Sequence, residues 1–227
     1  MSDTQRIVLV GASGLIGGAV IAATVGRSDV RLTALARREF ALPSGARMEL
    51  LVADPREWPA LIAGANADAL VVALGTTWRA AGRDEAAFRA VDEKLVLDCA
   101  KAAKAAGVPR CIAVSSVGAD ATSRNFYLRV KGEVETALAA LKFDRLDILR
   151  PGLLRGARGG ERRVGERLAI LASPLTDALL HGGLRRYRSV KAATVAKAIL
   201  NLAVEAPTGR FVHEHDAIVR ASKGSGN

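Results

Sequence analysis

The chain has 227 residues, half of them apolar, and 33 Lys and Arg against 23 Asp and Glu give it a formal net charge of +10 at pH 7. This length suits one substantial hydrophobic core, the composition excludes a disordered protein, and no apolar run approaches the roughly 20 residues of a membrane span. The basic residues are scattered and are not interleaved with aromatics, which favours a solvated surface over a specific nucleic-acid site.

The first half of the chain alternates apolar strand patterns with helical patterns. Its last helix is long and is ended by Gly107 and Pro109. The predicted elements are, in order, strand 6–10, helix 14–25, strand 31–36, strand 48–52, helix 58–63, strand 69–74 and helix 84–106.

The second half continues the alternation and then changes character. Its predicted elements are strand 110–114, helix 125–142, strand 145–149, a Gly/Arg-rich loop over 156–165, helices 168–180 and 194–204, and strand 211–214. Strands and helices at this spacing predict a doubly wound parallel α/β sheet with a small C-terminal helical extension. We expect one domain over 1–221, with small substrate-side elements over 153–190 and a disordered tail over 222–227.

A glycine-rich turn follows the first strand and opens the first helix. Gly11 allows a tight turn, Gly14 lets the backbone approach a pyrophosphate, and Gly17 lets the helix lie close to the sheet. The free N–H groups at the helix start favour a bound phosphate. The turn therefore predicts a dinucleotide site that includes Ser13, Leu15 and Ile16, and the alternative is a purely structural turn.

Ligands of such sheets bind outside the carboxyl ends of the strands. The polar and glycine residues of this chain gather at those ends, which supports the dinucleotide site. The further candidate residues at strand ends are Leu74, Gly75, Thr76, Thr77, Ser115, Ser116, Pro151, Gly152 and Leu153.

Arg37 and Arg38 follow the second strand, where an NAD site usually carries a carboxylate for the ribose hydroxyls. A guanidinium suits a 2′-phosphate, so we expect NADP(H) in preference to NAD(H), although Glu39 lies close by. The alternative is two surface arginines. Asp54, after the third strand, either contacts the adenine or caps the turn before Pro55.

Tyr127 and Lys131 lie one helical turn apart, so they share a helix face. An ammonium group near a phenol favours the phenolate, and such a tyrosine can exchange a proton with a carbonyl oxygen while a hydride moves. Ser115 or Ser116 would hydrogen-bond the same oxygen. The alternative is a surface pair on a helix.

Two features indicate a cytoplasmic protein. The first residues, up to Arg6, are polar and lack the basic-then-apolar pattern of a secretory leader. Cys99 and Cys111 lie in apolar patterns without metal-ligand spacing, which is typical of buried thiols and predicts no metal site.

With these residues in place, the chain resembles the atypical, epimerase-like branch of the short-chain dehydrogenase/reductase superfamily. Within that branch it is most similar to the Tat-interacting-protein oxidoreductase-like group. The matching stretches are Gly11-Ala-Ser-Gly-Leu-Ile-Gly17, Ala73-Leu-Gly-Thr-Thr77, Val91-Asp92, Ser115-Ser-Val-Gly-Ala-Asp120, Asn125-Phe-Tyr-Leu-Arg-Val-Lys-Gly-Glu-Val-Glu135 and Leu149-Arg-Pro-Gly-Leu-Leu154.

The resemblance implies a Rossmann-type NADP(H)-binding domain in which Tyr127 donates or accepts the proton and Lys131 orients the nicotinamide ribose. Many relatives place an asparagine on the long helix, where this chain has Asp92. The short interval from Ser116 to Tyr127 favours Ser115 as the serine that aligns the substrate.

Two functions remain open. One is an NADPH-dependent reductase of a small carbonyl substrate, and the other is a non-catalytic NADP(H)-binding regulator with a protein partner. Either would act as a monomer or homodimer. A nucleic-acid binder is supported by the charge alone.

Overall fold

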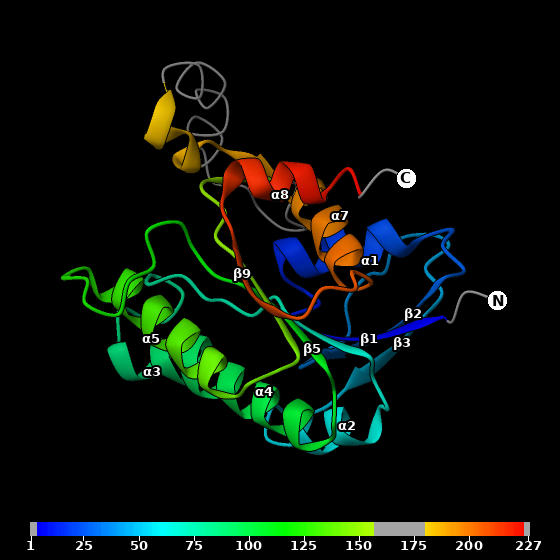
Figure 1. The fold of residues 1–227 in the computed structure, drawn as a ribbon. Helices are drawn as coiled ribbons and strands as arrows, with labels where there is room; N and C mark the ends of the chain where they lie inside the picture. Colours follow the sequence, from blue (N-terminus) through cyan, green and yellow to red (C-terminus); the bar gives the residue numbers. More distant parts are fainter. Residues whose placement is uncertain (1–3, 157–179, 225–227) are drawn as a thin grey trace.

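Seven parallel strands form one sheet in the order β3-β2-β1-β4-β5-β6-β9 in the computed structural model, which describes residues 4–156 and 180–224 (Figure 1). Its strands are β1 (Gln5–Val10), β2 (Val30–Ala36), β3 (Met48–Val52), β4 (Ala69–Val72), β5 (Arg110–Val114), β6 (Arg145–Leu149) and β9 (Gly209–His213). A separate pair is formed by β7 (Leu154–Arg155) and β8 (Val190–Lys191). The predicted doubly wound Rossmann-type fold is confirmed.

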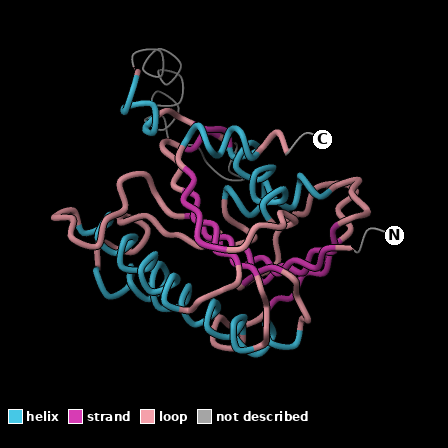
Figure 2. The backbone as a smooth tube through the Cα atoms, in the orientation of Figure 1, coloured by secondary structure: helices cyan, strands magenta, loops and turns pink. Residues whose placement is uncertain are grey.

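Helices cover both faces of the sheet (Figure 2). One layer contains α1 (Leu15–Thr24), α7 (Ala192–Leu202) and α8 (His215–Ala221), and it packs on the same face as Ile7 and Leu9 of β1. The other contains α2 (Trp58–Gly64), α3 (Glu85–Arg89), α4 (Val96–Ala105) and α5 (Phe126–Ala140), facing Val8 and Val10. Successive strand residues thus enter opposite cores, as expected for a sheet buried on both faces.

The predicted elements agree with the structure, with three local differences. The strand predicted over 69–74 ends at Val72, because residues from Ala73 onward leave the sheet. The helix predicted over 84–106 is interrupted by a π-helical segment, η1 (Ala90–Leu95). The short elements β7, β8, α8 and the 3-10 helix η2 (Gly182–Tyr187) were not predicted, because none carries a periodic apolar pattern. Residues 168–179 of the helix predicted over 168–180, and residues 157–165 of the loop predicted over 156–165, lie outside the described residues, and Leu180 is not helical.

The two cysteines are free and buried, as expected. Burial raises the pKa of the Cys99 thiol, and that of the Cys111 thiol, to about 12. Within the described part of the chain, no helix has the length and apolar character needed to cross a membrane.

Candidate functional site

The glycine turn requires glycine at two of its positions for steric reasons. Gly11 has a positive φ of 88°, and a Cβ there would lie 2.5 Å from the carbonyl carbon of Ala73. A Cβ at Gly17 would overlap the carbonyl oxygen of Gly11 and lie 2.7 Å from the Cα of Ala12. The helix α1 begins beside this turn with Gly14 as its N-cap, and no side chain caps its first N–H groups.

These contacts predict different effects for two adjacent substitutions. Gly17→Ala is expected to lower the free energy of unfolding by about 1–3 kcal/mol, because helix α1 must move away from the turn. Gly18→Ala is the matched control, since the nearest atom to its Cβ is 4.0 Å away and alanine favours a helix by up to about 1 kcal/mol. Urea unfolding of both variants checks this, and equal stabilities would contradict the close packing of Gly17.

A cleft of about 740 Å³ opens beside the turn, at the carboxyl ends of β1, β2, β3 and β4. This volume is within the usual range of small-molecule sites. It lies where the strand order reverses between β1 and β4, the position at which such sheets bind ligands. The predicted cofactor residues that line it are Gly11, Ser13, Gly14, Arg37, Leu74, Gly75 and Thr76.

Other predicted cofactor residues lie outside the walls of this cleft. Leu15, Ile16 and Gly17 belong to α1, and Arg38 and Thr77 are exposed beside the cleft. The cleft also has lining residues that the sequence did not single out. They include Ala12, Leu35, Ala36, Pro55, Arg56, Trp58, Ala73, Lys94 and Asp98.

Basic side chains border the cleft beyond β2 and β3. Arg37 is exposed and forms no ion pair with a carboxylate of the described residues. Asp54 pairs with Arg56 through contacts of 2.9 and 3.0 Å and accepts the backbone N–H of Arg56, which holds the pKa of its carboxyl at about 2. The structure thus favours the turn-capping alternative for Asp54, and it brings Arg56 to the cleft.

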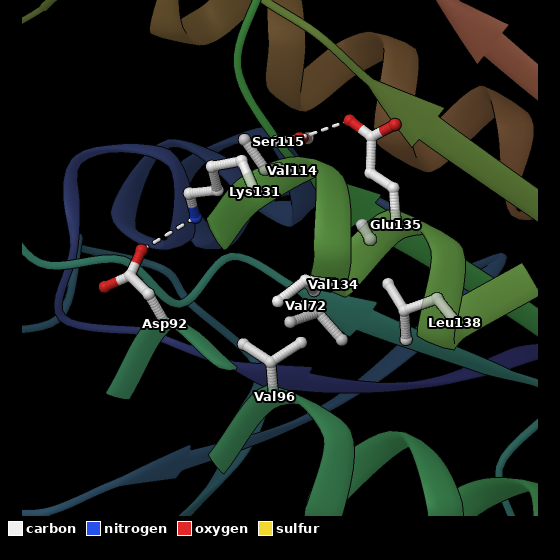
Figure 3. Close-up of a pocket in the computed structure, with 10 residues that line it drawn as sticks. Val72, Asp92, Val96, Val114, Ser115, Lys131, Val134, Glu135 and Leu138 are labelled. Carbon is white, nitrogen blue, oxygen red and sulfur yellow. Dashed lines mark hydrogen bonds and ion pairs between the residues drawn. The ribbon is translucent and has the colours of Figure 1, made fainter. Parts of the chain in front are cut away.

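Lys131 is not among the residues that line the cleft. Figure 3 shows its ammonium group directed at the carboxylate of Asp92. Its Nζ is 2.7 Å from Oδ1 of Asp92, and the two side chains are 7% and 0% exposed. The other oxygen of Asp92 accepts the backbone N–H of Thr76 at 2.7 Å. One buried carboxylate therefore joins α5 to the loop that lines the cleft.

Ser115 takes part in a second buried cluster (Figure 3). Its hydroxyl donates to Oε1 of Glu135 at 2.5 Å, and Arg150 donates to both oxygens of the same carboxylate. Hydrogen bonds to Glu135 raise the pKa of Arg150. Among the described residues, the hydroxyl of Ser116 makes only a long contact of 3.4 Å with the carbonyl oxygen of Val117. Ser115 is therefore committed to Glu135, and Ser116 is the less constrained hydroxyl.

The Asp92–Lys131 and Ser115–Glu135 pairs face a small cavity of about 10 Å³. Apolar side chains from β4, β5, α4 and α5 form the rest of its wall. This volume is close to the lower limit for one water molecule. The cavity is distinct from the wide cleft, so the structure gathers the predicted catalytic lysine and serine behind the cofactor loop.

Tyr127 lies in the first turn of α5, whose N-terminus is capped by Asn125 through a 3.2 Å hydrogen bond to the N–H of Leu128. Its ring packs edge-on against Phe88, with centroids 5.8 Å apart. The phenolic hydroxyl makes no hydrogen bond to any of the described residues, and it is half-buried. The group is therefore free to donate a proton to a ligand.

The loop after β6 packs beside the serine loop and not in the wide cleft. The carbonyl oxygen of Pro151 accepts the N–H of Val117 at 3.0 Å. A Cβ at Gly152 would lie 2.6 Å from the carbonyl oxygen of Arg188, and the carbonyl of Leu153 pairs with β8.

Solved structures with the same fold bind sugar nucleotides and NAD. MoeE5 in complex with UDP-glucose and NAD aligns with a TM-score of 0.69 at 16% identity, covering 96% of this chain and 80% of that chain. UDP-glucose 4-epimerase from Thermotoga maritima aligns with a TM-score of 0.68 at 16% identity, covering 92% and 77%. This agreement confirms the epimerase-like fold that the resemblance implied.

Fungal mitochondrial proteins are similar in sequence. "Protein fmp52, mitochondrial" of Aspergillus niger is 33% identical over 211 residues, 90% of this chain and 89% of that protein. "Protein FMP52, mitochondrial" of Saccharomyces cerevisiae is 36% identical over 185 residues, 80% of this chain and 76% of that protein.

These relatives contradict the predicted cytoplasmic location, since they are named as mitochondrial proteins. The prediction was wrong because it rested on a polar N-terminus and buried thiols, and neither feature identifies a compartment within the cell. The model of the family described as NAD(P)H-binding matches residues 11–206, which is most of the chain. The protein therefore belongs to the NAD(P)H-binding family, as its glycine turn and the adjoining cleft indicate.

Proposed function

We propose that this protein is an NADP(H)-dependent oxidoreductase that reduces a small carbonyl compound, with Tyr127 as the proton donor. The observation that carries this proposal is the free hydroxyl of Tyr127, one turn before the buried Lys131 on α5. The serine loop after β5 lies at the same carboxyl edge of the sheet. This arrangement supplies a proton donor, a fixed positive charge and a hydroxyl beside a cofactor cleft.

The residues around the cleft fit a dinucleotide. Gly11 and Gly14 line the cleft with backbone and no side chain, and the start of α1, which no side chain caps, offers N–H donors to a pyrophosphate. A bound reduced nicotinamide supplies a hydride to the carbonyl carbon. Tyr127 donates its phenolic proton to the carbonyl oxygen as that oxygen gains negative charge, and it regains a proton from solvent.

Ser116 is the serine that we assign to the substrate. A hydroxyl that donates to the carbonyl oxygen stabilises the charge that develops there. The hydroxyl of Ser115 already donates to Glu135, whereas that of Ser116 makes, within the part of the chain that the structure describes, only the long contact to Val117. Lys131 would donate to the nicotinamide ribose from behind the Gly75–Thr76 loop.

NADP(H) is the proposed form of the cofactor, because Arg37 and Arg56 both border the cleft beyond adjacent strands. Two guanidinium groups suit the dianionic 2′-phosphate that distinguishes NADP from NAD. Because MoeE5, one of the fold neighbours named above, was solved with NAD, the cofactor preference of this protein is tested by direct titration.

Arg37→Gln is expected to weaken NADPH binding by about 10–100-fold and to leave NADH binding unchanged, because a hydrogen bond between charged groups contributes about 1.5–3 kcal/mol. Arg31→Gln is the matched control, since Arg31 is exposed near the other end of the same strand. Fluorescence titration of both cofactors measures the effect. An equal loss for NADPH and NADH would show that Arg37 does not recognise the 2′-phosphate.

The activity itself is tested by incubating the protein with NADPH and a series of aldehydes, ketones and quinones, and following the loss of NADPH absorbance. The proposal expects turnover of at least one class. Tight NADPH binding without any turnover, together with capture of a protein partner only when NADPH is bound, would favour the regulatory alternative. Partner binding that ignores the cofactor would count against that alternative.

A further inference from the structure

Asp92 is a fully buried carboxylate that contacts two functional segments at once. It forms the ion pair with Lys131 that Figure 3 shows and accepts the N–H of Thr76, both at 2.7 Å. An unpaired buried charge is costly, and a buried pair is screened little by salt. The carboxylate therefore fixes the position of the lysine side chain.

The π-helical segment η1 places Asp92 in this position. Phe88, Asp92 and Val96 are all buried, at intervals of four residues along one face of the helical run. A regular α-helix with 3.6 residues per turn drifts away from such a spacing, whereas a wider turn keeps the three residues aligned. Segments of this kind are frequent at functional sites.

The cofactor loop lies directly against the same carboxylate. Thr76 and Gly75 both line the wide cleft, and a Cβ at Gly75 would lie 3.7 Å from Oδ1 of Asp92. Lys131 itself does not line that cleft. Asp92 therefore links Lys131 to the segment that lines the cleft.

We propose that Asp92 is a positioning residue that holds the Lys131 ammonium behind the Gly75–Thr76 loop and thereby couples binding of the nicotinamide half of the cofactor to Lys131. This inference rests on the proposed role of Lys131 toward the nicotinamide ribose. A merely structural Asp92 would tie η1 to α5, and its loss would affect all ligands of the cleft alike.

Asp92→Asn separates these roles, because an asparagine oxygen still accepts the N–H of Thr76 while the negative charge is lost. The dissociation constant for NADPH is expected to rise about tenfold, a typical size for coupling between sites. The ligand 2′,5′-ADP lacks the nicotinamide half of the cofactor. Its dissociation constant is expected to stay within about twofold of the wild-type value, a much smaller change than the tenfold rise expected for NADPH. Glu93→Gln, the adjacent acid on η1, is the control and is expected to change neither constant, since Glu93 pairs with Arg89.

A double-mutant cycle provides the second test. In a Lys131→Met background, adding Asp92→Asn is expected to cause no further loss of NADPH affinity, because no ammonium remains to be positioned. A melting curve shows whether Asp92→Asn folds. If it does not, the double variant Lys131→Met/Asp92→Asn, which buries no charge at these two positions, is still compared with Lys131→Met for NADPH affinity.

Three results would overturn the inference: unchanged NADPH affinity in Asp92→Asn, an equal loss of NADPH and 2′,5′-ADP affinity, or a further loss in the Lys131→Met background. These binding results do not depend on turnover. Absence of carbonyl reduction with the predicted binding pattern would refute the proposed reaction and leave the positioning role of Asp92 standing.

Discussion

Tyr127→Phe is expected to lower kcat for carbonyl reduction by about 10²–10⁴-fold, the usual contribution of a positioned general acid. The substitution removes only the hydroxyl, which has no partner among the described residues. The ring remains to pack against Phe88, so the fold is expected to be retained. NADPH affinity is expected to change little, because Tyr127 does not line the wide cleft.

Tyr187, the second of the chain's two tyrosines, provides the control. It is 40% exposed in η2, away from α5, so Tyr187→Phe is expected to keep the wild-type rate. Steady-state kinetics with a carbonyl substrate, alongside NADPH titration, separates the two effects. Full turnover by Tyr127→Phe would show that another group donates the proton.

Arg145→Met is expected to destabilise the protein by about 3–5 kcal/mol, or roughly 6–20 °C in Tm, because it leaves a buried carboxylate without its cation. The side chain of Arg145 is 3% exposed and donates to Asp147 at 2.6 and 3.0 Å and to Glu205 at 2.9 Å. It also lies 4.5 Å from the ring centre of Phe211. These contacts join β6 to the edge strand β9.

The double variant Arg145→Met/Asp147→Asn is expected to recover part of the lost Tm, since removing both charges avoids the unpaired ion. His213 contacts Asp147 at 2.7 Å and can bond to the amide instead. Arg27→Met is the control, because its pair with Asp29 is partly exposed and contributes little. If the loss of stability in the double variant equals the sum of the losses in Arg145→Met and Asp147→Asn alone, the two residues do not form a coupled buried pair.

The strands and the glycine turn were predictable because their signals are local. Apolar runs identify β1, β5 and β6 to within a residue, and alternation with helices predicts the parallel sheet. The segment α8 was not predicted, since only Ile218 of its seven residues is buried and its apolar pattern is correspondingly weak. The π-helical segment was also missed, because periodicity distinguishes it poorly from an α-helix.

The site was predictable in part. Arg37 and Thr76 follow strand ends and line the cleft, as a doubly wound sheet requires. The commitment of Ser115 to Glu135 was not predictable, because it joins residues twenty positions apart through tertiary packing. The same holds for Asp92 and Lys131. Arg56 could have been found, as a basic residue shortly after the third strand.

Transfer of deuterium from NADPH labelled at the reactive position of its nicotinamide tests the central claim most directly. The account predicts that wild-type protein, mixed with a carbonyl compound from the active class, yields an alcohol carrying the label in mass spectra. Tyr127→Phe is predicted to bind the labelled cofactor and to form almost no labelled alcohol. Saturating cofactor binding with no label in any product would contradict the proposed oxidoreductase.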